Sequence, residues 1–168
     1  MYDNNLDSIE VTTDVVNEPV SLDDVKSFLR IDFDTEDLLI KSLIKSARVY
    51  CEKYTGITFA PKKADMFINY QSGTIKLPVY PVTKVNEVNF IASDGSESEV
   101  TFYTLSPDTI NIDSLGAGMY VVDIEYGYAS LPDELKTGLL MAVGLLYAGR
   151  ELTQMKEVNL YLSNFKRF

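Results

Sequence analysis

The sequence predicts an α+β fold, a helical bundle of N- and C-terminal helices with a small antiparallel β lobe inserted between them. Apolar residues recur at helical spacing in residues 21–61 and again in residues 129–168. The runs within residues 62–128 are instead rich in Val, Ile, Tyr, Phe and Thr and are bounded by turn residues. Hydrophobic residues make up 46% of the 168 residues, which is enough for an ordinary core.

Residues 1–20 form an acidic arm ahead of the first predicted helix. The valines and acids of this arm follow no helical period, so the arm is expected to be extended. Two placements stay open at this point. The arm either crosses to a neighbouring subunit or packs on its own domain.

Two helices are predicted in residues 21–61. Ser21 and Asp24 form a capping-box pattern that opens the first, and the second is expected over residues 36–54 with Asp34 or Thr35 as its cap. Spacings of three and four define an apolar face of the second helix: Leu39, Leu43, Ala47, Tyr50 and Tyr54. The same spacing defines a basic stripe: Lys41, Lys45 and Arg48.

Six runs of the middle segment have the composition of strands. They are residues 66–70, 75–77, 82–91, 100–105, 109–112 and 119–126. Asp94-Gly95 and Gly116 to Gly118 are interpreted as the tips of two hairpins. Pro78 and Pro81 place the segment around them at a sheet edge or a bend.

The last major helix is expected to begin at Leu131-Pro132-Asp133, with the proline in its first turn. Residues 139–148 are apolar nearly all round, so this helix must be covered on several sides. The segment that follows has four apolar residues at spacings of three and four, Met155, Val158, Leu162 and Phe165, followed by Lys166, Arg167 and Phe168. It either docks on a partner or folds back over the apolar helix.

The composition excludes several classes of chemistry. The chain has no histidine and one cysteine, Cys51, which excludes Ser-His-Asp and Cys-His relays and the usual zinc sites. A carboxylate pair is the catalytic arrangement left, and no motif marks one among the 25 acids. We therefore expect no enzyme activity, no metal and no cofactor, and we expect Cys51 to be a buried core residue.

The net charge of −10 is concentrated in the first 40 residues, which hold 11 acids against Lys26 and Arg30. Clustered Lys and Arg for tight DNA binding are missing, so only loose, sequence-independent contact with DNA is expected. The longest apolar run, residues 139–148, is half the roughly 20 residues that a membrane span requires. The N-terminus lacks an apolar leader, so the chain is expected in the cytoplasm when made and away from membranes.

Two charged patterns are candidate contact sites. The carboxylates of residues 32–37 alternate as in a calcium loop, but the loop's glycine and distant glutamate are missing, and helix capping is the favoured interpretation. They are Asp32, Asp34, Glu36 and Asp37. The basic stripe could face nucleic acid or an acidic partner, and the alternative is an ordinary solvated helix face.

Several segments in the same order resemble the head-tail connector proteins of tailed bacteriophages. Leu29 to Ile40 and Ser46 to Gly56 look like the opening helices of that family. The similarity continues through Leu77-Pro-Val-Tyr-Pro-Val82, Glu125 to Tyr128, Leu131 to Lys136 and Tyr147 to Glu151. Leu162-Ser-Asn-Phe-Lys166 is similar to the family's closing Leu-x-Pro-Tyr-Arg, with Asn164 in place of the proline. The resemblance covers residues 21–168.

The resemblance implies an adaptor subunit of the virion's head-tail junction, assembled in the host cytoplasm. Its partners would be copies of itself in a ring, commonly a dodecamer, together with the portal protein, stopper or tail proteins, and double-stranded DNA passing without sequence specificity. The residues from Met155 onward are then expected to dock on the portal. The acidic cluster and the basic stripe are expected to lie at subunit contacts or at the lumen. Alternatives are a stopper or tail-completion protein, or a monomeric small-molecule binder or carboxylate hydrolase.

Overall fold

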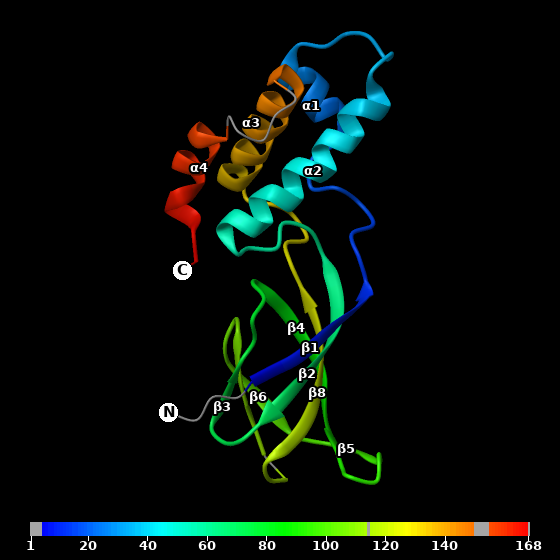
Figure 1. The fold of residues 1–168 in the computed structure, drawn as a ribbon, viewed down its shortest axis with the longest axis vertical. Helices are drawn as coiled ribbons and strands as arrows, with labels where there is room; N and C mark the ends of the chain where they lie inside the picture. Colours follow the sequence, from blue (N-terminus) through cyan, green and yellow to red (C-terminus); the bar gives the residue numbers. More distant parts are fainter. Residues whose placement is uncertain (1–4, 114, 150–154, 168) are drawn as a thin grey trace. The chain divides into compact units, whose positions relative to one another are not determined.

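A computed structural model of the chain describes residues 5–113, 115–149 and 155–167. These residues divide into two compact units. One unit comprises the strands and is built from the chain up to Val15 together with Pro61–Tyr128. The other comprises the helices and is built from Val16–Ala60 together with the chain from Ala129 onward (Figure 1).

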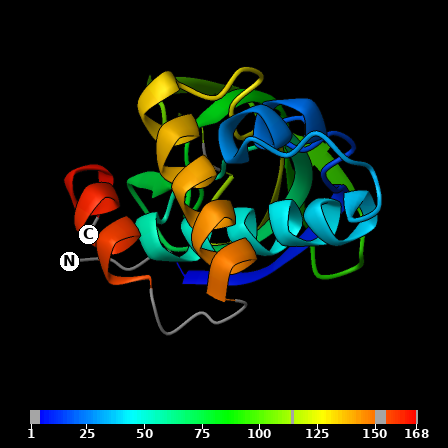
Figure 2. The same cartoon turned by 90° about the horizontal axis from the view of Figure 1, so that it is seen from above.

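The described part of the helical unit contains four α-helices: α1 (Leu22–Leu29), α2 (Asp37–Thr55), α3 (Asp133–Gly149) and α4 (Lys156–Leu162). A 3-10 turn, η2 (Ser163–Phe165), follows α4. The helix α3 contacts α1, α2 and α4, and Figure 2 shows it crossing over α2. The expected cover on several sides is therefore confirmed for this apolar helix. Six residues of α3 are buried: Leu135, Gly138, Leu139, Ala142, Val143 and Leu146.

The predicted capping box opens α1. Ser21 Oγ accepts a hydrogen bond from the Asp24 backbone N–H at 3.0 Å, and the Asp24 carboxylate accepts one from the Ser21 N–H at 3.1 Å. These two bonds, helped by Lys136, lower the pKa of Asp24 below its usual value. The helix ends at Arg30, which has a left-handed φ of 58°. The start of α1 is thus fixed by local hydrogen bonds.

The buried face of α2 differs from the predicted one by one position along the chain. Of the five residues expected inside, Ala47 alone is buried. The observed face consists of Ile40, Ile44, Ala47, Arg48, Cys51 and Thr55. The predicted cap is also wrong, because Glu36 occupies the N-cap position without a side-chain bond to the helix, while Asp34 binds Lys26 instead.

The strand unit holds eight strands in the described residues: β1 (Asn5–Thr13), β2 (Lys62–Tyr70), β3 (Thr74–Lys76), β4 (Val82–Ile91), β5 (Glu97–Glu99), β6 (Phe102–Ser106), β7 (Thr109–Ile112) and β8 (Gly118–Tyr126). The strand pairings among the described residues are all antiparallel. One sheet has the order β1-β2-β8-β4-β5 and the other has the order β3-β7-β6. Each of the six predicted runs overlaps a strand, although Leu77, Val100 and Thr101 lie outside the strands.

The two predicted hairpin tips have different outcomes. Asp94-Gly95 does turn the chain between β4 and β5, with a φ of +83° at Gly95. The prediction for Gly116 to Gly118 is wrong, because β7 and β8 belong to different sheets. The hydroxyl of Tyr120 binds this crossing segment, since it accepts the Leu115 N–H at 3.0 Å and donates to the Gly116 carbonyl at 2.9 Å.

The strand unit has its own core. Alternate residues of β2 and β8 point inward and are buried, as expected for strands with one solvated face. Tyr120 lies at the centre of an aromatic group, with its ring centroid 5.2 Å from that of Tyr70 and 5.1 Å from that of Phe90. Fourteen buried residues from both sheets form this core: Ala64, Met66, Ile68, Tyr70, Ile75, Leu77, Val88, Val100, Ile110, Ile112, Tyr120, Val122, Ile124 and Tyr126.

The predicted architecture is therefore wrong. The β part is not a small lobe inserted in a helical bundle, because its strands occupy nearly as many described residues as the helices and enclose a separate core. Residues 5–13 of the acidic arm also form β1 on the sheet of their own chain. The helices and the strands therefore form two separate compact units, and each unit is built from segments that are distant in the sequence.

A row of four carboxylates crosses the outer face of the larger sheet. Glu10 is paired in register with Asp65, Asp65 with Asp123, and Asp123 with Glu87. Burial, followed by these neighbouring carboxylates, raises the pKa of Asp65. The neighbouring carboxylate Glu125 has its charge balanced by a lysine. Lys63 Nζ lies 2.8 Å from Glu125 and lowers the pKa of that carboxyl.

The substitution Asp65→Asn is expected to raise the free energy of unfolding at pH 7 by about 0.5–1 kcal/mol, because opposed like charges destabilise a sheet. A raised folded pKa means that ionised Asp65 disfavours the folded state, so the gain should disappear as the pH falls below the ordinary value of 3.8. Urea denaturation at several pH values measures this. The control Glu125→Gln should lower stability at pH 7, since it removes the contact with Lys63; a stabilised Glu125→Gln variant contradicts the assignment.

Candidate assembly surfaces

The acidic residues before α2 are largely engaged inside the helical unit. Lys26 Nζ bonds to the carboxylates of Asp34 and Asp37, the latter at 2.9 Å, and these bonds raise the pKa of Lys26. The Tyr147 hydroxyl of α3 donates to Glu36 at 2.6 Å. Three of the four predicted acidic residues therefore hold α2 to α1 and α3.

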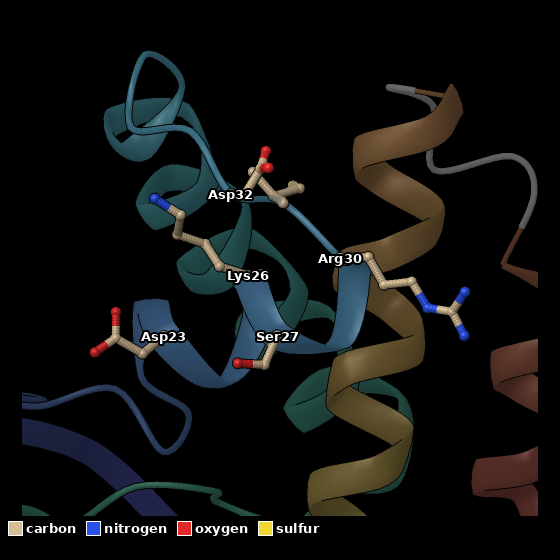
Figure 3. Close-up of a pocket in the computed structure, with 6 residues that line it drawn as sticks. Asp23, Lys26, Ser27, Arg30 and Asp32 are labelled. Atoms are coloured by element: carbon tan, nitrogen blue, oxygen red, sulfur yellow. The ribbon is translucent and has the colours of Figure 1, made fainter.

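Asp32, the fourth acidic residue, lines a shallow open hollow beside α1. Its other lining residues are Asp23, Lys26, Ser27, Arg30 and Ile31. Figure 3 shows that Arg30 extends away from Lys26, toward the side of α3. The lining of the hollow thus carries both charges, the carboxylates of Asp23 and Asp32 and the cations of Lys26 and Arg30.

The predicted basic stripe of α2 divides into two parts. Lys41 and Lys45 are exposed and lie on the solvent face of the helix. Arg48 is 3% exposed, with Nε 2.7 Å from a Glu18 carboxylate oxygen and Nη1 3.0 Å from Glu52. Glu52 also accepts the Phe59 backbone N–H at 2.8 Å. Arg48 therefore joins α2 to the segment before α1, and its partner Glu52 joins α2 to the segment that follows it.

The spacing of Arg48 in the sequence could not show whether its side chain is buried or exposed. Residue 48 lies four positions after Ile44 and three after Lys45, so a helical period places it equally well beside the buried or the exposed row. The one local signal was Glu52, four residues further on, where an acid can pair with Arg48 along a helix. The other partner, Glu18, lies 30 residues away in the sequence.

The C-terminal segment packs within the helical unit. Met155, Val158 and Leu162 are at most 1% exposed. Tyr50 of α2 donates a hydrogen bond to Asn159 of α4 at 2.8 Å. These three apolar residues therefore fix α4 against its neighbours.

The end of the segment also meets α2, while part of it faces solvent. The Arg167 backbone N–H bonds to the Thr55 carbonyl at 3.0 Å, and Lys166 Nζ lies 5.3 Å from the ring centroid of Tyr54. Phe165 is half-buried, with its ring 6.0 Å from that of Tyr161. Phe168 lies outside the described residues.

Two leucines of the helical unit are exposed, which the sequence pattern did not predict. Leu38 at the start of α2 is 83% exposed and Leu160 on α4 is 76% exposed. Phe28 on α1 is 48% exposed. Large apolar side chains in water are a feature of surfaces that bind other proteins.

Within the described residues, no group of three or more acidic or thiol side chains is placed to hold a metal ion. A search of the same residues finds no helix of the length and apolarity that a bilayer crossing requires. Cys51 is buried, and burial raises the pKa of its thiol to about 12. The features that stand out are thus surfaces with unmatched charge and exposed apolar groups.

Such surfaces are typical of a class of proteins that act through assembly, as structural components of a particle. The sequence matches the family described as phage gp6-like head-tail connector protein over residues 19–114, which is more than half of the chain. The chain belongs to this family, whose members are structural proteins of the phage virion and its neck. No match was found among curated proteins.

Three solved structures have the same fold over nearly the whole chain. A chain from the "Neck of empty GTA particle computed with C6 symmetry" is 18% identical with a TM-score of 0.77, over 95% of each chain. A chain from the "Virion of native gene transfer agent (GTA) particle" is 20% identical with a TM-score of 0.76, over 94% of each. A chain from the "Neck of native GTA particle computed with C12 symmetry" is 18% identical with a TM-score of 0.66, over 94% of each.

The substitution Arg48→Ala is expected to lower the free energy of unfolding by about 3 kcal/mol, because it leaves Glu18 and Glu52 without their buried partner. Lys45→Ala, on the same helix, should change it by less than about 0.5 kcal/mol, since that side chain is exposed. Guanidinium denaturation measures both. Equal effects of the two substitutions show that Arg48 is a surface residue.

The close approach of α4 to α3 provides a second test within the helical unit. A Cβ at Gly138 would lie 2.6 Å from Leu162 Cδ2, so Gly138→Ala should destabilise the unit by about 1–3 kcal/mol through overpacking. Gly144→Ala is the matched control, because its Cβ would meet Leu29 Cδ2 at 3.3 Å and the helix gains up to about 1 kcal/mol in propensity. Thermal unfolding that favours Gly138→Ala over Gly144→Ala contradicts the packing of α4 described above.

Proposed function

We propose that this chain is an adaptor subunit that forms a ring with copies of itself beneath the portal. The ring extends the DNA channel and joins the head to the neck or tail. The observation that carries the proposal is the fold match over at least 94% of both chains to proteins from neck assemblies of sixfold and twelvefold symmetry. Family membership supports the same conclusion.

Opposite charges on different elements suit a ring. A ring requires heterologous contacts, in which one surface of a subunit meets a different surface of the next. The exposed lysines of α2, Lys41 and Lys45, and the exposed carboxylates of Asp23 and Asp32 are one possible complementary pair for such a contact. Such pairs select the partner and its orientation more than they add affinity.

The outer face of the C-terminal segment is the proposed portal-docking element. Leu160 supplies exposed apolar area, and Phe165, Lys166 and Arg167 lie at the same end of the helical unit. Met155, Val158 and Leu162 contribute by holding α4 in place, because they are buried. Aromatic and apolar anchors commonly supply most of the binding energy of an interface.

The charge of the chain suits a channel through which DNA passes without being held. Tight binding requires many phosphate contacts from Lys and Arg, and the chain has 15 basic residues against 25 acidic ones. A neutral or acidic lumen would leave DNA free to slide during ejection. Any contact would be independent of sequence and weakened by salt.

Mass measurement by light scattering, for the chain alone and with portal-containing heads, tests the proposal. The expected result is a closed oligomer that joins portal-containing heads and is seen at the portal vertex by electron microscopy. A chain that stays monomeric under both conditions favours a small-molecule binder or hydrolase. A chain that binds a preformed adaptor ring and ignores the portal favours a stopper or tail-completion protein.

The substitution Leu160→Asp tests the docking element. It should weaken joining to portal-containing heads by roughly tenfold, about 1.4 kcal/mol, while the mass of the ring is retained. Leu38→Asp is the matched control, since this leucine is also exposed on a helix but lies at the start of α2. Unaltered joining by Leu160→Asp, or an equal loss with Leu38→Asp, rules out the assigned surface.

A further inference from the structure

We propose that the free edge of β1 pairs with the free edge of β6 on the neighbouring copy. The five-stranded sheet of one subunit would then continue into the three-stranded sheet of the next. This inference rests on the ring proposed above and names the strands that would close it. It is argued from the exposure, pairing and charge of the described edge strands.

β1 is an edge strand, and none of its side chains from Leu6 to Thr13 is buried. It pairs with β2 alone among the described strands, so its other edge is open. Every side chain from Leu6 to Thr13 is exposed. A strand of this kind is held by its backbone ladder and offers its second row of N–H and C=O groups to another strand.

The inner face of β1 is apolar and uncovered. Because residues in register share a face, three residues of β1 lie on the side of the sheet that carries the core. They are Leu6 opposite Ile68, Ile9 opposite Met66 and Val11 opposite Ala64. Their exposed fractions are 40%, 36% and 50%, respectively. The core face of the sheet therefore extends past the residues that its own chain covers.

The protection that natural edge strands usually carry is incomplete here. β1 contains neither proline nor lysine, the residues that most often block pairing at an edge. Two register shifts, between Leu6 and Ser8 and between Val11 and Thr13, interrupt its ladder to β2. Ser8–Val11 between them is regular, so a short segment remains suited to pairing.

Symmetry restricts the partner. If β1 paired with β1 of another copy, the contact would be isologous and would close at two subunits. A ring therefore needs a different edge, and the described sheets offer three others: β5, β3 and β6. β5 is acidic through Glu97 and Glu99 and would repel Asp7 and Glu10 of β1.

β6 fits β1 better than β3 does. It is an edge strand of five residues without charge, and Tyr103 and Leu105 are 52% and 54% exposed. β3 has three residues, of which Ile75 is buried. Lys76 of β3 would attract the acids of β1, but exposed ion pairs contribute little to binding. Apolar cover for Leu6, Ile9 and Val11 is available at β6.

Crosslinking of introduced cysteines tests this pairing in the full chain. Cys51 is buried with a thiol pKa of about 12, so the wild-type protein should not react. The double variant Ile9→Cys/Leu105→Cys, treated with a short bismaleimide, should give a ladder of covalent oligomers on a denaturing gel. Each single variant should remain monomeric on that gel. The pair Ile9→Cys/Lys76→Cys, which reports on β3, should give no ladder.

A second pair of variants does not depend on crosslinking geometry. Val11→Asp should reduce the fraction of ring at a given concentration by at least tenfold. Val16→Asp, at a valine that is 82% exposed but lies beyond β1, should leave the ring unchanged. Circular dichroism checks that both variants remain folded.

The outcomes separate this inference from the function on which it rests. A dimer from Ile9→Cys alone, or a ladder from the pair with Lys76→Cys, assigns a different partner to β1 and overturns the inference. A ring by light scattering that gives no ladder from Ile9→Cys/Leu105→Cys and survives Val11→Asp also overturns it, while the ring stands. A wild-type chain that never forms a ring removes the proposed function and this inference together.

Discussion

The apolar surface of α3 constrains the helical unit more than any other feature. Burial of apolar area stabilises a fold by roughly 25 cal/mol per Å², and this helix carries such area nearly all round. α1, α2 and α4 each cover a part of it. Because α1 and α2 precede β2 to β8 in the sequence and α4 follows α3, the unit must be assembled from segments on both sides of these strands. The ion pair between Glu18 and Arg48 holds the segment that leads from β1 into α1 against α2.

Charged groups have two separate uses in the molecule. Three cations form ion pairs within the helical unit, and each pair joins elements that are apart in the sequence. They are Lys26, Arg48 and Lys136. Lys41, Lys45 and the carboxylate row on the larger sheet remain outside these contacts and face solvent. The first group serves the fold of one subunit. The second group leaves the surface unbalanced, which suits a protein of the connector family that must recognise partners.

Local signals in the sequence predicted most helices and strands. The wrong predictions concern features that depend on residues far apart in the sequence. The capping box of α1 and six strands depend on neighbouring residues, so they were visible. β1 was not, because its two register shifts break the alternation of Leu6, Ile9 and Val11 that marks a strand. The buried role of Arg48 depends on Glu18, 30 residues away. The same spacing that placed Met155, Val158 and Leu162 together could not say whether α3 or a partner covers them.

The strand order has a consequence for how the protein is made. β8 lies in the middle of the larger sheet, between β2 and β4, although it comes last in sequence among the described strands. During translation, β2 and β4 therefore lack the strand that joins them until residue 126 has left the ribosome. The contacts of α1 and α2 with α3 form later still, because α3 follows β8 in the sequence. Both units close over long stretches of chain, which slows folding and leaves nascent strands dependent on chaperones or on their own solubility. The acidic N-terminal quarter is then a benefit, since repulsion between nascent chains opposes their aggregation.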